Sequence, residues 1–184
     1  MNINNYKKYN FQNLKSGKQT YCQISGKKNL IDVIDLGNQP LADTLIEKKD
    51  LNKKVRKYPL KLLRSPTLGY AQLSYVVPGK KVYHPNYPYR PGITKEIIEH
   101  HSEQAKKNKN KYKLNENELV VDIGSNDGTL LKCYKALNFN VLGIEPTNMA
   151  DVASKDGVET IKAPFDLKIA KEVSKKYGKA KLMT

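Results

Sequence analysis

The sequence predicts an α/β protein in which a small β-rich module precedes an incomplete Rossmann-like domain. From residue 118 onward, short apolar runs alternate with helical patterns as far as Thr184. Before residue 93, short apolar runs are separated by turns rich in glycine, proline and asparagine, which is typical of antiparallel strands. The two parts of the chain therefore follow different folding patterns.

The composition fits a globular protein with a basic surface. The chain has 184 residues, of which 39% are hydrophobic, and its formal net charge is +15. Such a charge attracts polyanions, but only three of the basic residues are arginines and the lysines are dispersed. This pattern disfavours a nucleic-acid-binding surface, although a basic nucleic-acid-binding protein stays an alternative.

Cysteine usage and hydropathy indicate a cytoplasmic protein. Cys22 and Cys133 lie far apart, so no disulfide framework is predicted and a reducing compartment fits. No apolar stretch approaches the roughly 20 residues of a membrane span. The residues after Met1 also lack the apolar core of a signal peptide. We expect no membrane partner, and the oligomeric state is left open.

The first part of the chain is predicted to hold an arm, a β-rich module and a linking helix. Residues 1–20 are rich in lysine and asparagine and predict a flexible basic arm. The β-rich module is expected over residues 21–92 and the linking helix within residues 93–117. Inside the module we predict a strand over 30–36, a turn at 37–40, a hairpin of strands 58–64 and 70–76, and a tyrosine-rich loop ending at residue 92.

The last part, residues 118–184, predicts an incomplete Rossmann-like domain. Strands are expected over 119–123, 140–145, 158–162 and 180–184, with helices over 128–138, 147–156 and 166–177. A Rossmann-type domain normally has about six strands. We therefore expect that the chain is a fragment or that the missing strands come from elsewhere.

A glycine-bracketed turn follows the first of these strands and predicts a cofactor site. Gly124 allows a sharp turn, and Gly128 allows a ligand to approach the backbone. Glu145 ends the next strand, 17 residues after Gly128, where a carboxylate can accept hydrogen bonds from ribose hydroxyls. The predicted cofactor-binding residues are Asp122, Gly124, Ser125, Asn126, Asp127, Gly128, Glu145 and Pro146.

The middle of this turn favours one cofactor class. A dinucleotide site needs glycine where this chain has Asn126, and Asp127 would repel a pyrophosphate. An acidic turn suits a cofactor with a cationic part, so S-adenosylmethionine is favoured over NAD or FAD. Two alternatives remain open: a glycine turn in a nucleotide-free domain, and a Glu145 that only caps the helix after Pro146.

These residues and several other segments carry a resemblance to a known family. The chain resembles the S-adenosylmethionine-dependent sugar C-methyltransferases of deoxysugar biosynthesis. The resemblance lies in the segments VDIGSNDGTLL (121–131), VLGIEP (141–146), DLGNQPLA (35–42), YPL (58–60), GYAQL (69–73) and YPYRPG (87–92). It implies a methyltransferase domain that is preceded by a small zinc-binding module.

The resemblance also implies a reaction and a substrate. Members of the family methylate a carbon of a nucleotide-linked keto-deoxysugar, which must first lose a proton to a general base. Tyr87 and Tyr89 are candidates for substrate-facing hydroxyls, although aromatic packing of their loop is the alternative. The family's main base is expected beyond Thr184, so the catalytic residues are unknown. A catalytically inactive S-adenosylmethionine-binding fragment is the alternative function.

The family's zinc module is expected to be degenerate here. Its two Cys-x-x-Cys pairs align with Cys22 to Ser25 and with Ser65 to Leu68, so Cys22 is the only thiolate that remains. A structural zinc needs four nitrogen or sulfur ligands, so we predict a zinc-ribbon-like fold without metal. His84 is interpreted as a hydrogen-bonding loop residue. The hairpin is then expected to be held by the packing of Leu30, Val33, Leu60, Leu62, Leu73 and Val76.

Overall fold

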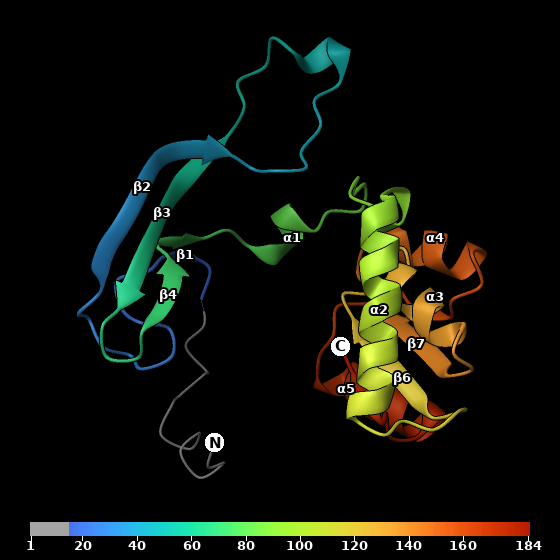
Figure 1. Cartoon of the computed structure of the whole chain (residues 1–184). Coiled ribbons are helices and arrows are strands. Elements are labelled where there is room, and N and C mark those ends of the chain that lie inside the picture. The colour runs from blue at the N-terminus through green and yellow to red at the C-terminus, as the bar shows by residue number, and fades with distance from the viewer. Residues whose placement is uncertain (1–14) are drawn as a thin grey trace. The chain divides into compact units, whose positions relative to one another are not determined.

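The computed structural model describes residues 15–184, which fall into two compact units (Figure 1). The first unit ends at Val82 and the second is Tyr83–Thr184. Antiparallel strands form the first unit, and a parallel sheet with helices forms the second, which confirms a mixed α/β protein. None of the helices within residues 15–184 is both long and apolar enough to cross a bilayer.

The first unit contains two small antiparallel sheets. Strands β2 (Ile31–Pro40), β3 (Lys57–Ser65) and β4 (Tyr70–Leu73) pair in that order, and β3 and β4 form the predicted hairpin. Strand β1 (Gly17–Lys18) pairs with β5 (Tyr75–Val76). Most of the predicted arm, residues 1–14, lies outside the described residues, whereas Gly17–Lys18 belongs to a strand. Helices η3 (Lys48–Asp50) and α1 (Gly79–Val82) complete the unit.

Strand β2 is longer than predicted, because the expected turn at residues 37–40 does not form: a bulge before Asn38 is followed by regular pairing of residues 38–40 with β3. The register of β2 against β3 shifts between Asp35 and Asn38. Gly37 has a φ of +69°, and its N–H donates to Asp35 Oδ1 at 2.9 Å. The left-handed backbone of Gly37 and its hydrogen bond to the Asp35 side chain stabilise the bulge, and the strand continues to Pro40.

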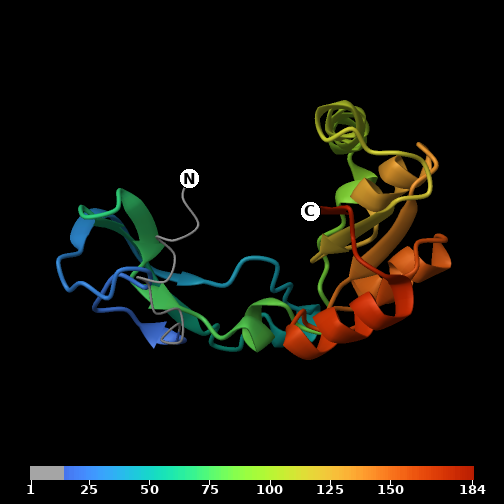
Figure 2. The same ribbon diagram turned by 90° about the horizontal axis from the view of Figure 1, so that it is seen from below.

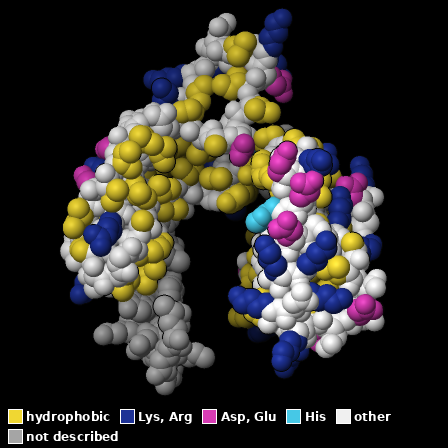
Figure 3. All heavy atoms as spheres, viewed as in Figure 1, with side chains coloured by type: hydrophobic (Ala, Val, Ile, Leu, Met, Phe, Trp, Pro, Cys, Tyr) yellow, Lys and Arg dark blue, Asp and Glu magenta, His cyan; other side chains and the backbone are white. Residues whose placement is uncertain are grey.

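The apolar core of the first unit is small. Cys22, Tyr58 and Leu63 are buried, whereas Val33 and Leu73 are 55% and 43% exposed, so the predicted packing was wrong for those two residues. Hydrophobic side chains gather on the surface of this unit (Figure 3), and on β2 they are Ile31, Val33, Ile34 and Leu36.

A buried amide supplements this small core. The Gln72 side chain is 5% exposed, donates to the Tyr21 carbonyl at 3.1 Å and accepts from Gln23 N–H at 2.9 Å. Because Gln72 lies in the middle of β4, these bonds attach the turn around Cys22 to the sheet.

The second unit begins with η4 (Pro91–Ile93) and α2 (Lys95–Lys111), and then alternates strands and helices as predicted. These elements are β6 (Leu119–Ile123), α3 (Thr129–Lys135), β7 (Asn140–Ile144), α4 (Met149–Lys155), β8 (Thr160–Ile161), α5 (Leu167–Tyr177) and β9 (Leu182–Met183). The sheet has the order β8-β7-β6-β9 and all its pairs are parallel.

Helices cover both faces of this sheet. Val120 packs into a cluster with residues of α2, α3 and α4, whereas its neighbour Val121 packs into a second cluster with Val173 of α5. Successive residues of a strand face opposite sides, so α5 lies on the face opposite to the other three helices. Figure 2 shows α2 end-on and α5 on opposite sides of the strands. Burial on both faces explains the near-continuous apolar runs of β6 and β7.

Candidate functional site

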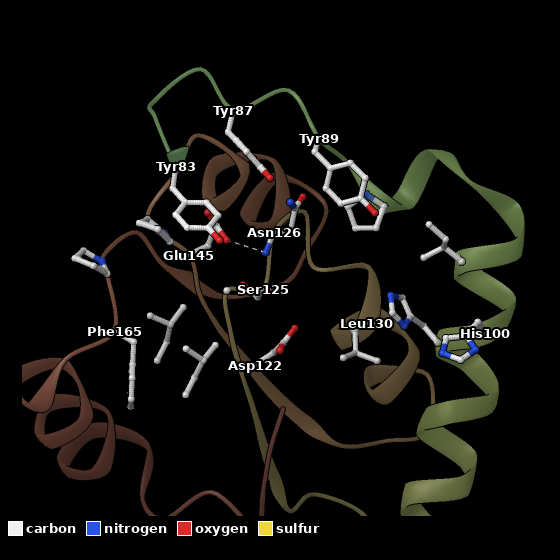
Figure 4. Close-up of a pocket in the computed structure, with 18 residues that line it drawn as sticks. Tyr83, Tyr87, Tyr89, His100, Asp122, Ser125, Asn126, Leu130, Glu145 and Phe165 are labelled. Atoms are coloured by element: carbon white, nitrogen blue, oxygen red, sulfur yellow. Dashed lines mark hydrogen bonds between the residues drawn. The ribbon is translucent and has the colours of Figure 1, made fainter. Parts of the chain in front are cut away.

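A cavity of about 850 Å³ lies within the second unit at the carboxyl ends of β6 and β7 (Figure 4). Its wall is formed by residues 83–91, one side of α2, the turn after β6, the end of β7 and the connection before α5. Ile123 pairs with Ile144, so the residues that follow each strand are neighbours. Ligand cavities of this size can bury a cofactor-sized molecule.

Glu145 anchors the turn through its carboxylate. It is 5% exposed, its Oε2 accepts from Asn126 N–H at 3.0 Å, and its Oε1 accepts from Thr147 N–H at 2.9 Å. Figure 4 shows the first of these bonds at the edge of the cavity. Each carboxylate oxygen can accept a further hydrogen bond, so Glu145 is oriented by the backbone and still available to a ligand.

The turn depends on left-handed backbone at three positions. Gly124, Asn126 and Gly128 have φ values of +78°, +51° and +74°. Glycine adopts this conformation without strain, and asparagine tolerates it better than most residues. A Cβ on Gly128 would lie 3.1 Å from Val158, so this glycine also allows close packing against the segment before β8.

Asp122 and Ser125 bring two further buried polar groups to the cavity wall. Asp122 is 8% exposed and accepts a 3.0 Å hydrogen bond from the Thr184 hydroxyl. Burial raises the pKa of Asp122 above its usual value, against the opposing effects of Thr184 and His101. Ser125 is 4% exposed, and its buried hydroxyl has no hydrogen-bond partner among residues 15–184. An unpaired buried hydroxyl is costly, so the site fits a polar ligand.

Two predicted cofactor residues, Asp127 and Gly128, do not line the cavity, whereas Asp122, Gly124, Ser125, Asn126, Glu145 and Pro146 do. Asp127 is 1% exposed, and its carboxylate accepts hydrogen bonds from Thr129 and Gly92. The acids that face the cavity are therefore Asp122 and Glu145. This placement corrects the physical argument about the turn, because the charge of Asp127 is not directed at a ligand.

The tyrosine loop, defined as residues 83–92, groups with the second unit rather than with the β-rich module. Tyr87 and Tyr89, the candidates for substrate-facing hydroxyls, line the cavity together with Tyr83. The rings of Tyr83 and Tyr87 are 5.9 Å apart, and His84 contacts Tyr87 edge-on at 6.2 Å. Figure 4 shows the three tyrosines projecting from the loop toward the turn. Their hydroxyls can reach a molecule bound there.

Several residues that line the cavity were not predicted from the sequence. Ile97, His100 and His101 line the cavity from α2, and none of them was assigned to a site from the sequence. The shared helical face of Ile97 and His101 was the available signal, since a polar residue on an apolar face can border a cavity. Phe165 reaches the cavity from the segment before α5, and no motif in the sequence indicates it.

The residues around Cys22 do not fit the zinc ion that the family resemblance implies. The turn is closed by hydrogen bonds from Gly26 N–H to the Cys22 carbonyl at 2.8 Å and from Ser25 N–H to Cys22 Sγ at 3.4 Å. The other aligned positions hold two serines and Leu68, which supply no further thiolate or imidazole. In residues 15–184 no group of three His, Cys, Asp or Glu side chains could hold a metal ion, and residues 1–14 contain none of these residue types.

Cys22 is held by hydrogen bonds instead. Burial alone would raise the pKa of the Cys22 thiol, but hydrogen bonding, mainly with Ser25, outweighs it and lowers the pKa to about 7. Cys22 is fully buried in the small core, so its sulfur is a packing and hydrogen-bonding group of this unit.

Two comparisons with known proteins both point to methyltransferases. Residues 22–83 match a methyltransferase-associated family described as a putative zinc binding domain. The chain is also 29% identical over 163 residues to the C-methyltransferase NovU of Streptomyces niveus, which covers 88% of this chain and 39% of that protein. The chain thus spans about two fifths of the length of this relative. These matches confirm that the chain resembles the N-terminal part of the sugar C-methyltransferase family.

Proposed function

We propose that the cavity binds S-adenosylmethionine and serves methyl transfer to a carbon of a nucleotide-linked keto-deoxysugar. The observation that carries the proposal is the buried carboxylate of Glu145 at the end of β7, oriented by two backbone N–H groups and facing the cavity beside Asp122. Because the relative is much longer than this chain, the proposal concerns the activity of a whole protein to which these residues contribute.

The topology supports a nucleotide-type cofactor. Along the second unit, the strands have the spatial order third, second, first, fourth, and all are parallel. This order is that of the first part of a Rossmann-like domain, whose ligands bind beyond the carboxyl ends of the strands near the point where the order reverses. That point lies between β6 and β9, where Asp122 and Thr184 meet.

The charges of the cavity support S-adenosylmethionine rather than a dinucleotide. Asp122 and Glu145 are two buried acids in one wall, which disfavours a pyrophosphate and favours a cation. In this proposal Glu145 accepts hydrogen bonds from the ribose hydroxyls, and Asp122 faces the positively charged end. Gly124, Ser125 and Asn126 line the wall between them, and Ser125 offers its unpaired hydroxyl. The cofactor supplies an electrophilic methyl group.

The tyrosine loop supports a substrate position beside the cofactor. Tyr83, Tyr87 and Tyr89 line the part of the cavity formed by the loop, and a phenol can donate a hydrogen bond to an oxygen that becomes negative. C-methylation next to a ketone requires the loss of a carbon-bound proton and gives such an oxygen. We therefore assign hydrogen bonding to the ketone oxygen to these tyrosines, and we assign the base to none of the residues described.

Isothermal titration calorimetry tests the cofactor. We expect S-adenosylmethionine and S-adenosylhomocysteine to bind and NAD not to bind. Glu145→Ala should weaken S-adenosylmethionine at least about tenfold, since charge-assisted hydrogen bonds contribute roughly 1.5–3 kcal/mol. Glu172→Ala is the matched control, because Glu172 is an exposed carboxylate on α5. Tighter binding of NAD, or equal affinities for the two variants, would refute the proposed site.

A methyl-transfer assay separates the enzyme from the binding-only alternative. The chain is incubated with isotopically labelled S-adenosylmethionine and a nucleotide-linked keto-deoxysugar, and the products are analysed by mass spectrometry. Labelled sugar supports the enzyme. Binding of the cofactor without any transfer supports the alternative that these 184 residues bind S-adenosylmethionine but do not themselves catalyse the transfer.

A further inference from the structure

Asp127 is the most completely buried acid of the cofactor turn, and its partners come from two segments of the chain. Its Oδ1 accepts from the N–H of Thr129 at 3.2 Å and from the Thr129 hydroxyl at 2.5 Å. Its Oδ2 accepts from the N–H of Gly92 at 3.0 Å. One carboxylate oxygen thus accepts hydrogen bonds from the start of α3, and the other accepts a hydrogen bond from the end of the tyrosine loop.

The contact with the loop is close as well as polar. A Cβ on Gly92 would lie 2.7 Å from Asp127 Oδ2 and 2.6 Å from the Thr129 hydroxyl. The φ of Gly92 is outside the left-handed range, so the backbone conformation alone does not require glycine here. The requirement comes from the approach of the loop to the turn, since no side chain fits between them.

A charged neighbour completes the arrangement. Arg90 Nε lies 3.8 Å from Asp127 Oδ2, and the Arg90 side chain is partly exposed. The Arg90 Nε atom has no hydrogen-bond partner within residues 15–184, so it contributes as an ion pair at a distance. Both Arg90 and Gly92 follow Tyr89 along the loop, so these contacts act near the tyrosines that face the cavity.

We propose that Asp127 is a positioning residue that fastens the tyrosine loop to the cofactor turn. Its carboxylate holds Gly92 on one side and Thr129 on the other, while the neighbouring Asn126 N–H holds Glu145. Two adjacent residues of one turn thus fix both parts of the site: Asp127 holds the tyrosine loop, and Asn126 holds the Glu145 carboxylate. The importance of this fastening for methyl transfer rests on the proposed function, whereas the fastening itself does not.

The chemistry of the carboxylate suggests a variant that separates its two roles. All three of its hydrogen-bonding partners are donors, so both oxygens must accept. In Asp127→Asn one oxygen becomes an NH₂ donor, and one donor must then face another. If the remaining oxygen keeps the two bonds from Thr129, the NH₂ group faces Gly92 N–H and the loop is released. Gly92→Ala releases the loop from the other side without changing Asp127.

Hydrogen–deuterium exchange of the full chain, made without cofactor, tests the fastening. We expect Asp127→Asn and Gly92→Ala each to raise the exchange rate in residues 83–93 at least about tenfold, since the loss of one charge-assisted hydrogen bond is of this order. Exchange in β6 and β7 should stay unchanged. Thr129→Ser, which keeps the hydroxyl donor, is the matched control and should leave the loop protected.

Three results would overturn the proposal. The first is unchanged exchange of the loop in both variants. The second is an equal rise in β6 and β7, which would make Asp127 a general stabiliser of the unit. The third is a loss of S-adenosylmethionine affinity in Asp127→Asn as large as in Glu145→Ala together with a protected loop, which would make Asp127 a cofactor ligand. A failure of S-adenosylmethionine to bind the unmodified chain would refute the proposed function and leave the exchange result standing.

Discussion

At the scale of single residues, the two acids of the cavity wall differ in how their charge is compensated. The Glu145 carboxylate accepts hydrogen bonds from two backbone N–H groups, whereas the Asp122 carboxylate accepts one hydrogen bond, from the Thr184 hydroxyl. Burial accordingly raises the pKa of Asp122. A buried carboxylate with one neutral partner is a cost to the fold that a cationic ligand would offset.

Asp122→Asn is expected to stabilise the protein and to weaken cofactor binding. A carboxyl group whose folded-state pKa is raised binds more protons in the folded state, so its contribution to stability falls as the pH rises from the usual aspartate value. Asparagine removes the charge and keeps an acceptor for Thr184. At pH 7 we expect a gain of about 1 kcal/mol, which raises the Tm by roughly 4 °C.

Thermal unfolding followed by circular dichroism at pH 7 and at about pH 4 checks this prediction. The difference between Asp122→Asn and the unmodified chain should shrink at the lower pH, because both then carry a neutral group. Asp151→Asn, at an exposed carboxylate that pairs with Lys162, is the control. A lower Tm for Asp122→Asn at pH 7 would contradict the prediction.

At the scale of elements, the turn after β6 contains two positions that favour glycine for different physical reasons. Both have left-handed backbone, but a Cβ on Gly124 meets nothing within 4 Å, whereas one on Gly128 meets Val158 at 3.1 Å. Left-handed backbone costs a non-glycine residue about 1–2 kcal/mol. We expect Gly124→Ala to destabilise by this amount and Gly128→Ala by at least about 1 kcal/mol more, because overpacking adds to the strain.

Urea unfolding of single and double variants separates the two contributions. Val158→Ala should offset part of the cost of Gly128→Ala by making room, and it should leave the cost of Gly124→Ala unchanged. If Val158→Ala offset the loss of stability equally in both glycine variants, the contact with Val158 would not be the cause of the larger loss in Gly128→Ala.

The elements that could be predicted from the sequence are those whose pattern is set locally. Strands β6 and β7 are buried on both faces and read as apolar runs, and their carboxyl ends must meet in a parallel sheet. The sequence therefore predicted that Asp122, Gly124 and Glu145 lie close together, and in the structure all three line the cavity. The direction of Asp127 could not be predicted, because it depends on Gly92, which lies 35 residues earlier. Residues 37–40 have the composition of a turn, and only pairing with β3 keeps them in a strand.

At the scale of the whole molecule, the two units differ in how they are held together. The second unit has apolar clusters on both faces of its sheet, whereas within residues 15–82 the buried apolar side chains are Cys22, Tyr58 and Leu63. In a family with a zinc module, metal ligation would compensate for a small core. In this chain, hydrogen bonds of Cys22 and Gln72 hold the turn around Cys22, and the sequence did not predict these hydrogen bonds.

We therefore expect the stability of the first unit to be independent of zinc. Dialysis against a chelator, or addition of equimolar zinc, should leave the Tm within about 1 °C, since three of the four ligand positions supply no thiolate or imidazole. Metal analysis should find less than about 0.1 zinc per chain, because a weak site is emptied by dialysis. Stoichiometric zinc that resists dialysis, with a Tm that falls on chelation, would refute this prediction.

The placement of Tyr83, Tyr87 and Tyr89 around one cavity has an optical consequence. The chain contains twelve tyrosines and no tryptophan, so its near-ultraviolet emission comes from phenol rings alone, and a quarter of them border the site. An adenine ring that enters the cavity would lie close to these rings and change their emission. The unlabelled protein therefore carries its own reporter of occupancy, and conversion of these three rings to phenylalanine, one at a time, would show which of them senses the ligand.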